Sequence, residues 1–165
     1  DFFANMLFLV AGVFGVFMTT NLFFFFLFYE VAVIPMYLLI VIWGSTNKQY
    51  AAMKLTLYLL LGSALMFVGF LYMYSLPGSH TFELLQLKQN VTFSPDQQNI
   101  LFLGFFLGFG VLAACFPFHV WSPDGHVAAP TAASMLHAGV LMKLGAYGIL
   151  RVAVYLLPDG ARRRG

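Results

Sequence analysis

Two ionisable residues, Glu30 and Lys143, each lie deep inside an apolar run of the sequence. A charged side chain at the centre of a membrane-spanning helix costs about 2.5–3.5 kcal/mol on insertion scales, and such residues usually serve a function. We therefore expect both side chains to face the interior of a helix bundle and to carry charge or protons. The alternative is a hydrogen bond that only holds two helices together.

Lys143 would suit proton transfer, because burial disfavours the charged form of a lysine and lets it release and recover a proton. His137 lies about two helical turns before Lys143. Because histidine titrates near neutral pH, this side chain would extend such a path. A neutral histidine hydrogen-bonded to a neighbouring helix is the alternative at this position. Tyr147, one turn beyond Lys143, is expected to pack against its neighbours.

Prolines and a glycine interrupt the sequence between residues 117 and 130, so a continuous α-helix is not expected there. Irregular backbone at membrane depth is tolerated where protein or water covers it. Three side chains of this stretch can bind protons or metals, namely His119, Asp124 and His126. Their spacing is poor for a metal site, and we expect Asp124 to cap the start of a helix. A turn outside the membrane is the alternative for the whole stretch.

Lys54 lies near the start of another apolar run. It either belongs to a path for protons or extends its ammonium group to the membrane surface, as lysines near helix ends often do. The sequence does not decide between these two interpretations.

The composition requires a membrane environment for the elements that hold these residues. Apolar residues make up 61% of the chain and charged residues 8%, and the mean hydropathy is +0.87. In a soluble domain, roughly a quarter of the residues are charged. The excess apolar surface of this chain must therefore face lipid. The net charge of +2 gives no reason to expect a nucleic acid partner. The single cysteine excludes an internal disulfide and a cysteine set for an iron–sulfur cluster.

Five apolar runs have about the length of a membrane-spanning helix, which needs roughly 20 residues. They cover residues 2–18, 22–43, 51–74, 100–118 and 131–157. None shows the alternation of a transmembrane barrel strand. The predicted fold is an all-α polytopic bundle of about five transmembrane helices, one of them broken. We treat 1–165 as one transmembrane domain, with 75–98 as a connection outside the membrane, and expect it to be a segment of a longer protein.

Four segments carry a resemblance to a known family. In order, they are Tyr29-Glu30 with Pro35-Met36-Tyr37, Ala51 to Lys54, Pro117 to His126 with Ala129-Pro130-Thr131, and Leu141 to Arg151. Together they resemble the antiporter-like, proton-translocating subunits of respiratory complex I, most of all the branch called subunit M or chain 4. The resemblance implies the first of two inverted five-helix repeats, from about the fourth spanning helix of the family to the eighth.

The resemblance also implies roles for single residues. Glu30 matches a mid-membrane glutamate that pairs with a lysine, and Lys143 matches a lysine that passes protons onward. His137 matches a position that holds histidine in some related subunits. The family's pairing lysine falls five residues before Pro117, where this chain has Leu112.

Without that lysine, Glu30 needs another partner. Lys54, His119 and Lys143 are the candidates that the sequence offers. If none of them serves, the carboxyl group stays protonated and the path for protons works differently or not at all.

The implied function is proton translocation as part of an NADH:quinone oxidoreductase. The chain itself would hold no redox cofactor, since NADH, FMN, iron–sulfur clusters and quinone belong to partner subunits. Its expected partners are other membrane-arm subunits and the lipid of a bacterial plasma membrane. The alternatives are a subunit of a cation/proton antiporter or a membrane-bound hydrogenase, and a structural subunit that no longer pumps.

Overall fold

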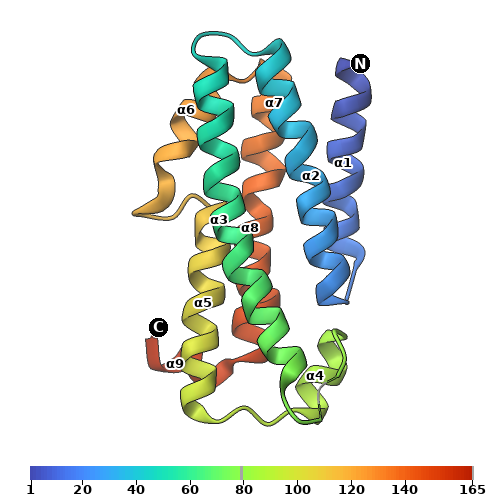
Figure 1. Cartoon of the computed structure of the whole chain (residues 1–165), viewed down its shortest axis with the longest axis vertical. Coiled ribbons are helices and arrows are strands. Elements are labelled where there is room, and N and C mark those ends of the chain that lie inside the picture. Colours follow the sequence, from blue (N-terminus) through green and yellow to red (C-terminus); the bar gives the residue numbers. More distant parts are fainter. Residues whose placement is uncertain (79, 165) are drawn as a thin grey trace.

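The structure is a computed structural model that describes residues 1–78 and 80–164, and these residues form a bundle of helices (Figure 1). Its elements are α1 (Phe2–Met18), α2 (Leu22–Trp43), α3 (Lys48–Ser75), α4 (Leu84–Asn90), α5 (Pro95–Leu112), η1 (Phe118–Val120), α6 (Trp121–Ala128), α7 (Thr131–Leu136), η2 (His137–Leu141), α8 (Met142–Gly148), η3 (Ile149–Val154) and α9 (Pro158–Arg164).

The first two helices begin and end where the apolar runs predict. Between them, the Asn21 side chain accepts hydrogen bonds from the backbone N–H groups of Phe23 and Phe24, at 3.0 and 3.4 Å. This cap satisfies donors that have no partner inside the first turn of α2. The second helix continues through Pro35 to Trp43.

Helices α3 and α5 pack closely because glycines face each other where they meet. A Cβ atom placed on Gly62 of α3 would lie 2.8 Å from the carbonyl oxygen of Gly108 on α5. Small residues allow such close approach of two helix backbones in membrane proteins. α3 therefore runs alongside α5 in the middle of the bundle (Figure 1).

The predicted break is present, but it is shorter than the sequence indicates. α5 ends at Leu112, and the chain swings out at mid-height of the bundle before α6 continues toward the upper end (Figure 1). The prediction that no continuous α-helix spans residues 117–130 is confirmed, because α6 (Trp121–Ala128) ends before Pro130 and α7 begins at Thr131. Pro123 lies in the first turn of α6, where its missing N–H group would have no helical partner anyway.

The last long helix is continuous but not uniformly α-helical. α7, η2, α8 and η3 follow one another without interruption from Thr131 to Val154, and η2 and η3 are π-helical turns. Short π-helical turns within α-helices often occur at functional sites.

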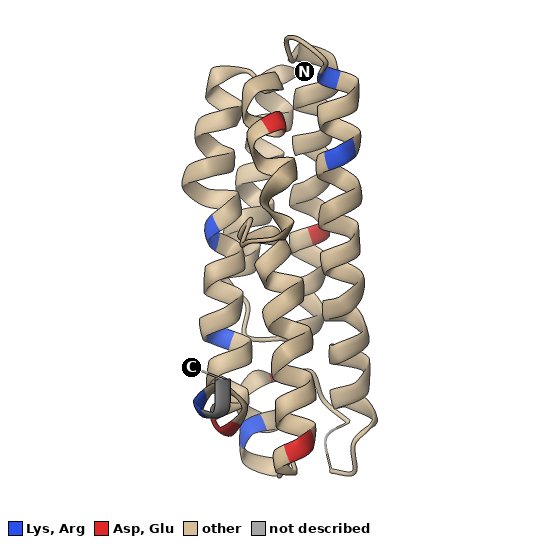
Figure 2. Ribbon diagram, turned by 90° about the vertical axis from the view of Figure 1, so that its left-hand side faces the viewer, with Lys and Arg blue, Asp and Glu red and all other residues tan. Residues whose placement is uncertain are grey.

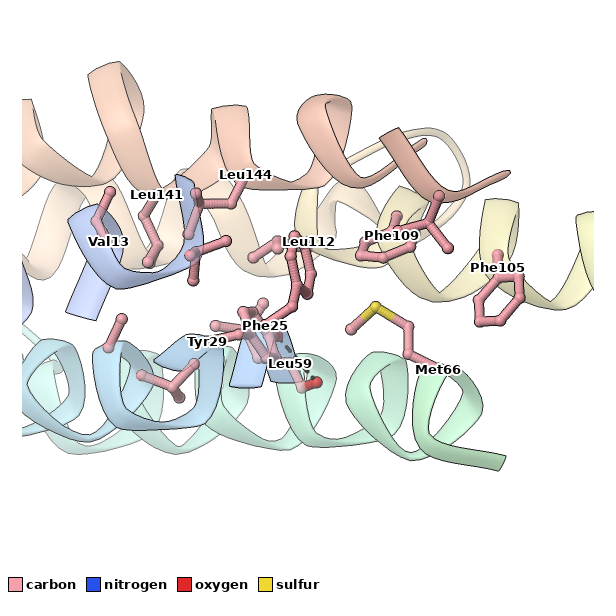
Figure 3. Close-up of a cluster of buried hydrophobic side chains, with 14 of the residues drawn as sticks. Val13, Phe25, Tyr29, Leu59, Met66, Phe105, Phe109, Leu112, Leu141 and Leu144 are labelled. Carbon is pink, nitrogen blue, oxygen red and sulfur yellow. Dashed lines mark hydrogen bonds between the residues drawn. The ribbon is translucent and has the colours of Figure 1, made fainter. Parts of the chain in front are cut away.

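The buried core consists almost entirely of apolar side chains from every long helix. Figure 3 shows its centre, where Phe25, Leu59, Phe109, Leu112 and Leu144 meet. Many other large apolar residues remain exposed on the outside of the bundle. Among the described residues, three helices are long and apolar enough to cross a membrane, namely α2, α3 and the helix from Thr131 to Val154. The prediction of an all-α membrane bundle with one broken helix is confirmed.

The connection predicted outside the membrane folds against one end of the bundle. It contains the short helix α4, and Glu83 pairs with Asn21 in an isolated antiparallel bridge. The Leu22 N–H group donates to the carbonyl oxygen of Phe82 at 2.9 Å. Its location outside the membrane remains a prediction.

Candidate functional site

The candidate site lies between the middle of the bundle and one of its ends. We call this the turn end, because it holds the α2–α3 turn (residues 44–47) and the α6–α7 junction. The Ser45 N–H group donates to the carbonyl oxygen of Ala128 at 2.8 Å, and the Ser45 hydroxyl donates to that of Val127 at 3.1 Å. These bonds fix the two connections side by side. Charged residues are sparse along most of the bundle (Figure 2).

Glu30 and Lys143 lie at nearly the same depth. Glu30 is thirteen residues before Trp43, and Lys143 is twelve residues after Thr131. At about 1.5 Å per residue, both lie roughly 18–20 Å from the turn end, near the middle of a membrane about 30 Å thick. Each residue therefore lies near the middle of its own helix, and the two helices place them at a similar distance from the turn end.

Glu30 is half-buried between α2 and α3. Its Oε1 atom is buried and has no hydrogen-bond partner among the described residues, while the Ser63 side chain interacts with the carboxyl group from α3. A buried polar atom without a partner is costly and rare in native proteins. The carboxyl group is thus held in an apolar setting with a free position for a proton or a hydrogen-bond donor.

None of the three candidates for pairing with Glu30 reaches it. Lys54 forms an ion pair with Asp124 instead, with 2.6 Å between Nζ and Oδ2. His119 is exposed in η1, beside the ring of Phe116. Lys143 lies on the exposed face of α8. Position 112, where the resemblance predicts a lysine, holds a leucine that is 1% exposed, in the core.

Lys143 also differs from the expectation, because its side chain lies on the exposed face of α8 and is not buried. Ala146 and Leu150, three and seven residues later, are exposed on the same face. Leu144 and Gly145 turn inward and pack on the core. The Lys143 side chain therefore points away from the rest of the described chain, at about the depth of Glu30.

His137 lies deep inside the bundle. Its side chain has 0% exposure, and neither ring nitrogen has a hydrogen-bond partner among the described residues. The alternative of a histidine hydrogen-bonded across helices is therefore wrong. The ring is stacked between Trp121, at 5.3 Å, and His126, at 4.5 Å between ring centroids.

Asp124 does not cap a helix. Val120 precedes α6, and Asp124 lies in its first turn, where it accepts the hydrogen bond from Lys54. α6 packs on α3 through Gly125 and Leu55, and the alternative that this stretch lies outside the membrane stays a prediction.

Sequence reasoning missed the connection between His126 and Ser134. The Nδ1 atom of His126 lies 2.9 Å from the Ser134 hydroxyl oxygen. These residues are eight apart and on different helices, and no local pattern marks them as neighbours. The turn at Ala129-Pro130 between two helices was the available signal, since a short connection brings adjacent helices together.

Tyr147 packs as predicted, with ring centroids 4.9 Å from Phe17 and 6.3 Å from Phe25. In the part of the chain that the structure describes, no group of three His, Cys, Asp or Glu side chains is placed to hold a metal ion.

Comparison with known proteins gives a consistent result over most of the chain. The family described as "NADH:quinone oxidoreductase/Mrp antiporter, TM" matches residues 19–162. NADH-quinone oxidoreductase subunit M of Rickettsia bellii is 42% identical over 149 residues, which cover 90% of this chain and 30% of the relative.

Solved structures share the fold. A chain of respiratory complex I from Thermus thermophilus with bound NADH has a TM-score of 0.90 and 29% identity, covering 98% of this chain and 34% of that one. A chain of the Mrp complex from Dietzia sp. DQ12-45-1b has a TM-score of 0.82 and 25% identity, covering 97% and 30%. The chain spans about a third of the length of these relatives. By the extent of these matches, it belongs to the transmembrane family of NADH:quinone oxidoreductase and Mrp antiporter subunits.

Proposed function

We propose that this chain is a proton-translocating part of an NADH:quinone oxidoreductase of the complex I type. The observation that carries the proposal is the buried, unpartnered Oε1 atom of Glu30 at the same depth as Lys143, in the middle of apolar helices. An unpaired carboxyl group at this depth can hold or release a proton according to the charges around it. Redox chemistry elsewhere in the complex would supply the changes in charge.

We also propose that the exposed face around Lys143 is covered in the complete subunit, so that Lys143 meets polar groups there and passes protons onward. The limited coverage of the relatives supports this, because most of their length lies outside the segment matched here. NADH, FMN, iron–sulfur clusters and quinone would be held by partner subunits. The single cysteine of this chain supports that division of labour.

The partners that we propose are other membrane-arm subunits and lipid, and the compartment is a bacterial plasma membrane. Similarity to bacterial subunits M supports this compartment. A cation/proton antiporter subunit is the second candidate function, because the chain also matches a subunit of the Mrp complex. A structural subunit without pumping is the third, favoured by Leu112 at the place of the expected lysine.

The test is the ratio of protons moved to electrons transferred, measured in reconstituted complex that carries the full-length subunit. Glu30→Gln and Lys143→Ala should each lower this ratio, because each removes a titrating group from the centre of the bundle. Glu83→Gln and Lys48→Ala make the same kinds of change at the ends of the bundle and should leave it unchanged.

An unchanged ratio in both Glu30→Gln and Lys143→Ala would contradict the pump proposal and favour the structural subunit. Proton movement that requires sodium and occurs without NADH would favour the antiporter. These outcomes separate the three candidate functions.

A further inference from the structure

Ser63 of α3 lies opposite Glu30 of α2. The two helices run antiparallel from the α2–α3 turn (Figure 1), and the rings of Phe26 and Phe67 lie 5.0 Å apart, centroid to centroid. Phe26 is four residues before Glu30, and Phe67 is four residues after Ser63. Residues four apart share one face of a helix. The same two faces therefore bring the Ser63 hydroxyl group to the Glu30 carboxyl group, and these two side chains interact.

Close packing on the other side of α3 fixes the place of Ser63. The preceding residue, Gly62, lies against α5, where a Cβ atom on Gly62 would be 2.8 Å from the carbonyl oxygen of Gly108. The Ser63 side chain is 3% exposed. A buried hydroxyl group in an apolar bundle is costly unless it is hydrogen-bonded. Its partners therefore indicate what this serine does.

The Ser63 hydroxyl group donates its one proton within its own helix. Its Oγ atom lies 3.0 Å from the carbonyl oxygen of Leu60, and a carbonyl oxygen can only accept. The lone pairs of Oγ remain available for another donor. A protonated Glu30 carboxyl group can be that donor, whereas the ionised group has no proton to give. The hydroxyl position in the structure therefore suits protonated Glu30.

Ionised Glu30 needs the opposite arrangement of the same hydroxyl group. Rotation about the Cβ–Oγ bond of Ser63 turns its proton from Leu60 to the carboxylate, where it makes a charge-assisted hydrogen bond. The Leu60 carbonyl group loses little, because it lies inside α3 and also accepts from the backbone N–H group four residues later. One hydroxyl group can thus serve both forms of the carboxyl group without movement of either helix.

The other polar groups around this part of α2 are engaged elsewhere. The Tyr29 hydroxyl group donates to a backbone carbonyl oxygen of α3 at 3.3 Å. Lys54 forms its ion pair with Asp124, closer to the turn end. The helices α1 and α7 also pack on α2, and neither carries a charged side chain. Among the described residues, this leaves Ser63 as the polar partner of Glu30.

We propose that Ser63 positions the proton of Glu30, by accepting a hydrogen bond from the protonated carboxyl group and donating one to the carboxylate. This inference rests on the proposed function, because it identifies the residue that lets Glu30 change its protonation state at the centre of the bundle. The O–H bond of Ser63 stays intact in both states, so Ser63 is a positioning residue and transfers no proton. It supplies the carboxylate with a donor in a chain whose position 112 holds a leucine.

The experiment compares variants of the full-length subunit in the reconstituted complex. Ser63→Ala should lower the ratio of protons moved to electrons transferred, but less than Glu30→Gln does, because the titrating group is still present. Ser63→Cys keeps the packing volume with a weak donor and should lower the ratio as Ser63→Ala does. Ser75→Ala is the matched control, since its hydroxyl group makes the same kind of bond, to the Tyr72 carbonyl oxygen at 2.8 Å, at the exposed end of α3. It should leave the ratio unchanged.

Infrared difference spectroscopy of the same complexes reports on the hydrogen bond itself. The C=O stretching band of protonated Glu30 is the band that Glu30→Gln removes. Ser63→Ala should move this band to higher wavenumber, because a carboxyl group that loses a hydrogen bond absorbs there. Ser75→Ala should leave the band in place. The rate of quinone reduction reports assembly in every variant.

The outcomes separate this inference from the proposed function. An unchanged ratio in assembled Ser63→Ala, with Glu30→Gln impaired, would overturn the inference and leave the proposed function standing. A lowered ratio with an unmoved band would also overturn it, because Ser63 would then act only through packing. In the Glu30→Gln background, Ser63→Ala should cause no further loss, and an additive loss would count against the coupling of the two residues. An unchanged ratio in Glu30→Gln itself would reject both.

Discussion

The ionisable residues of this chain fall into two groups that differ in their partners. Lys54 and Asp124 satisfy each other at the rim of the site, where water reaches the carboxylate. Glu30 and His137 have buried polar atoms without partners among the described residues. Paired charges hold a fixed state, whereas an unpaired group can change its protonation. The Lys54–Asp124 pair therefore fixes the position of the helices that carry it, whereas the unpartnered groups in the interior can exchange protons.

The Lys54–Asp124 pair should tolerate exchange of its two charges. Asp124→Lys or Lys54→Asp alone places two like charges where the native pair has 2.6 Å between Nζ and Oδ2, and should reduce assembly and proton movement. The double variant restores an opposite pair and should recover most of both. The yield of assembled complex and the proton-to-electron ratio are the measurements. If each single variant behaves as the parent does, the pair has no role in positioning α6 on α3.

At the scale of elements, the site depends on how closely α8 approaches α5. A Cβ atom on Gly145 would lie 2.6 Å from the Ala113 nitrogen and 2.6 Å from the Phe109 carbonyl oxygen. This contact seats the helix that carries His137 and Lys143 against the end of α5, next to Leu112. A small displacement of this helix along α5 would move His137 and Lys143 relative to Glu30.

Gly145→Ala should therefore destabilise the subunit by about 1–3 kcal/mol, the usual cost of extra volume in a packed core. Gly139→Ala is the matched control in the same helix, because nothing lies within 4 Å of a Cβ at that position. The melting temperature of the purified complex and its resistance to proteolysis should fall only for Gly145→Ala. Equal effects of both substitutions would show that α8 does not need this close approach.

On the scale of the whole molecule, basic residues lie at both ends of the bundle. Lys48 begins α3 at the turn end, and Arg162 belongs to α9 at the other end (Figure 1). A bias of basic residues toward one side normally indicates which side faces the cytoplasm. This chain gives no such bias, and orientation has to be measured.

Cysteine labelling provides that measurement. In a Cys115→Ser background, Thr46→Cys lies in the α2–α3 turn and Gln89→Cys lies in α4, at opposite ends of α3. A membrane-impermeant maleimide should label these two positions from opposite sides of sealed vesicles. The background without either cysteine controls for other reactions. Labelling of both from the same side would mean that α3 does not cross the membrane.

The sequence predicts the fold well where an apolar run has clear ends. The bounds of α1 and α2 are correct to the residue, because Asn21 caps a helix between two uninterrupted runs. It predicts less where helices are short. The start of α6 was predicted at Asp124 and lies at Trp121, because a proline in the first turn of a helix resembles a helix breaker when only the sequence is read.

The residues of the candidate site could be predicted from the sequence, but most of the contacts between them could not. Glu30, His137 and Lys143 stand out because charged and polar groups are expensive within apolar helices. The Lys54–Asp124 pair joins residues seventy positions apart, and only tertiary packing brings them together. The outward direction of Lys143 likewise depends on which face of α8 meets the core.

The helix from Thr131 to Val154 turns His137 toward the inside of the bundle and Lys143 toward its outside. The helix therefore carries one titratable side chain on each of two different faces. A shift of one residue in register would turn both side chains by about 100° around the helix axis. The two groups keep their different surroundings only while the helix keeps its register against α5.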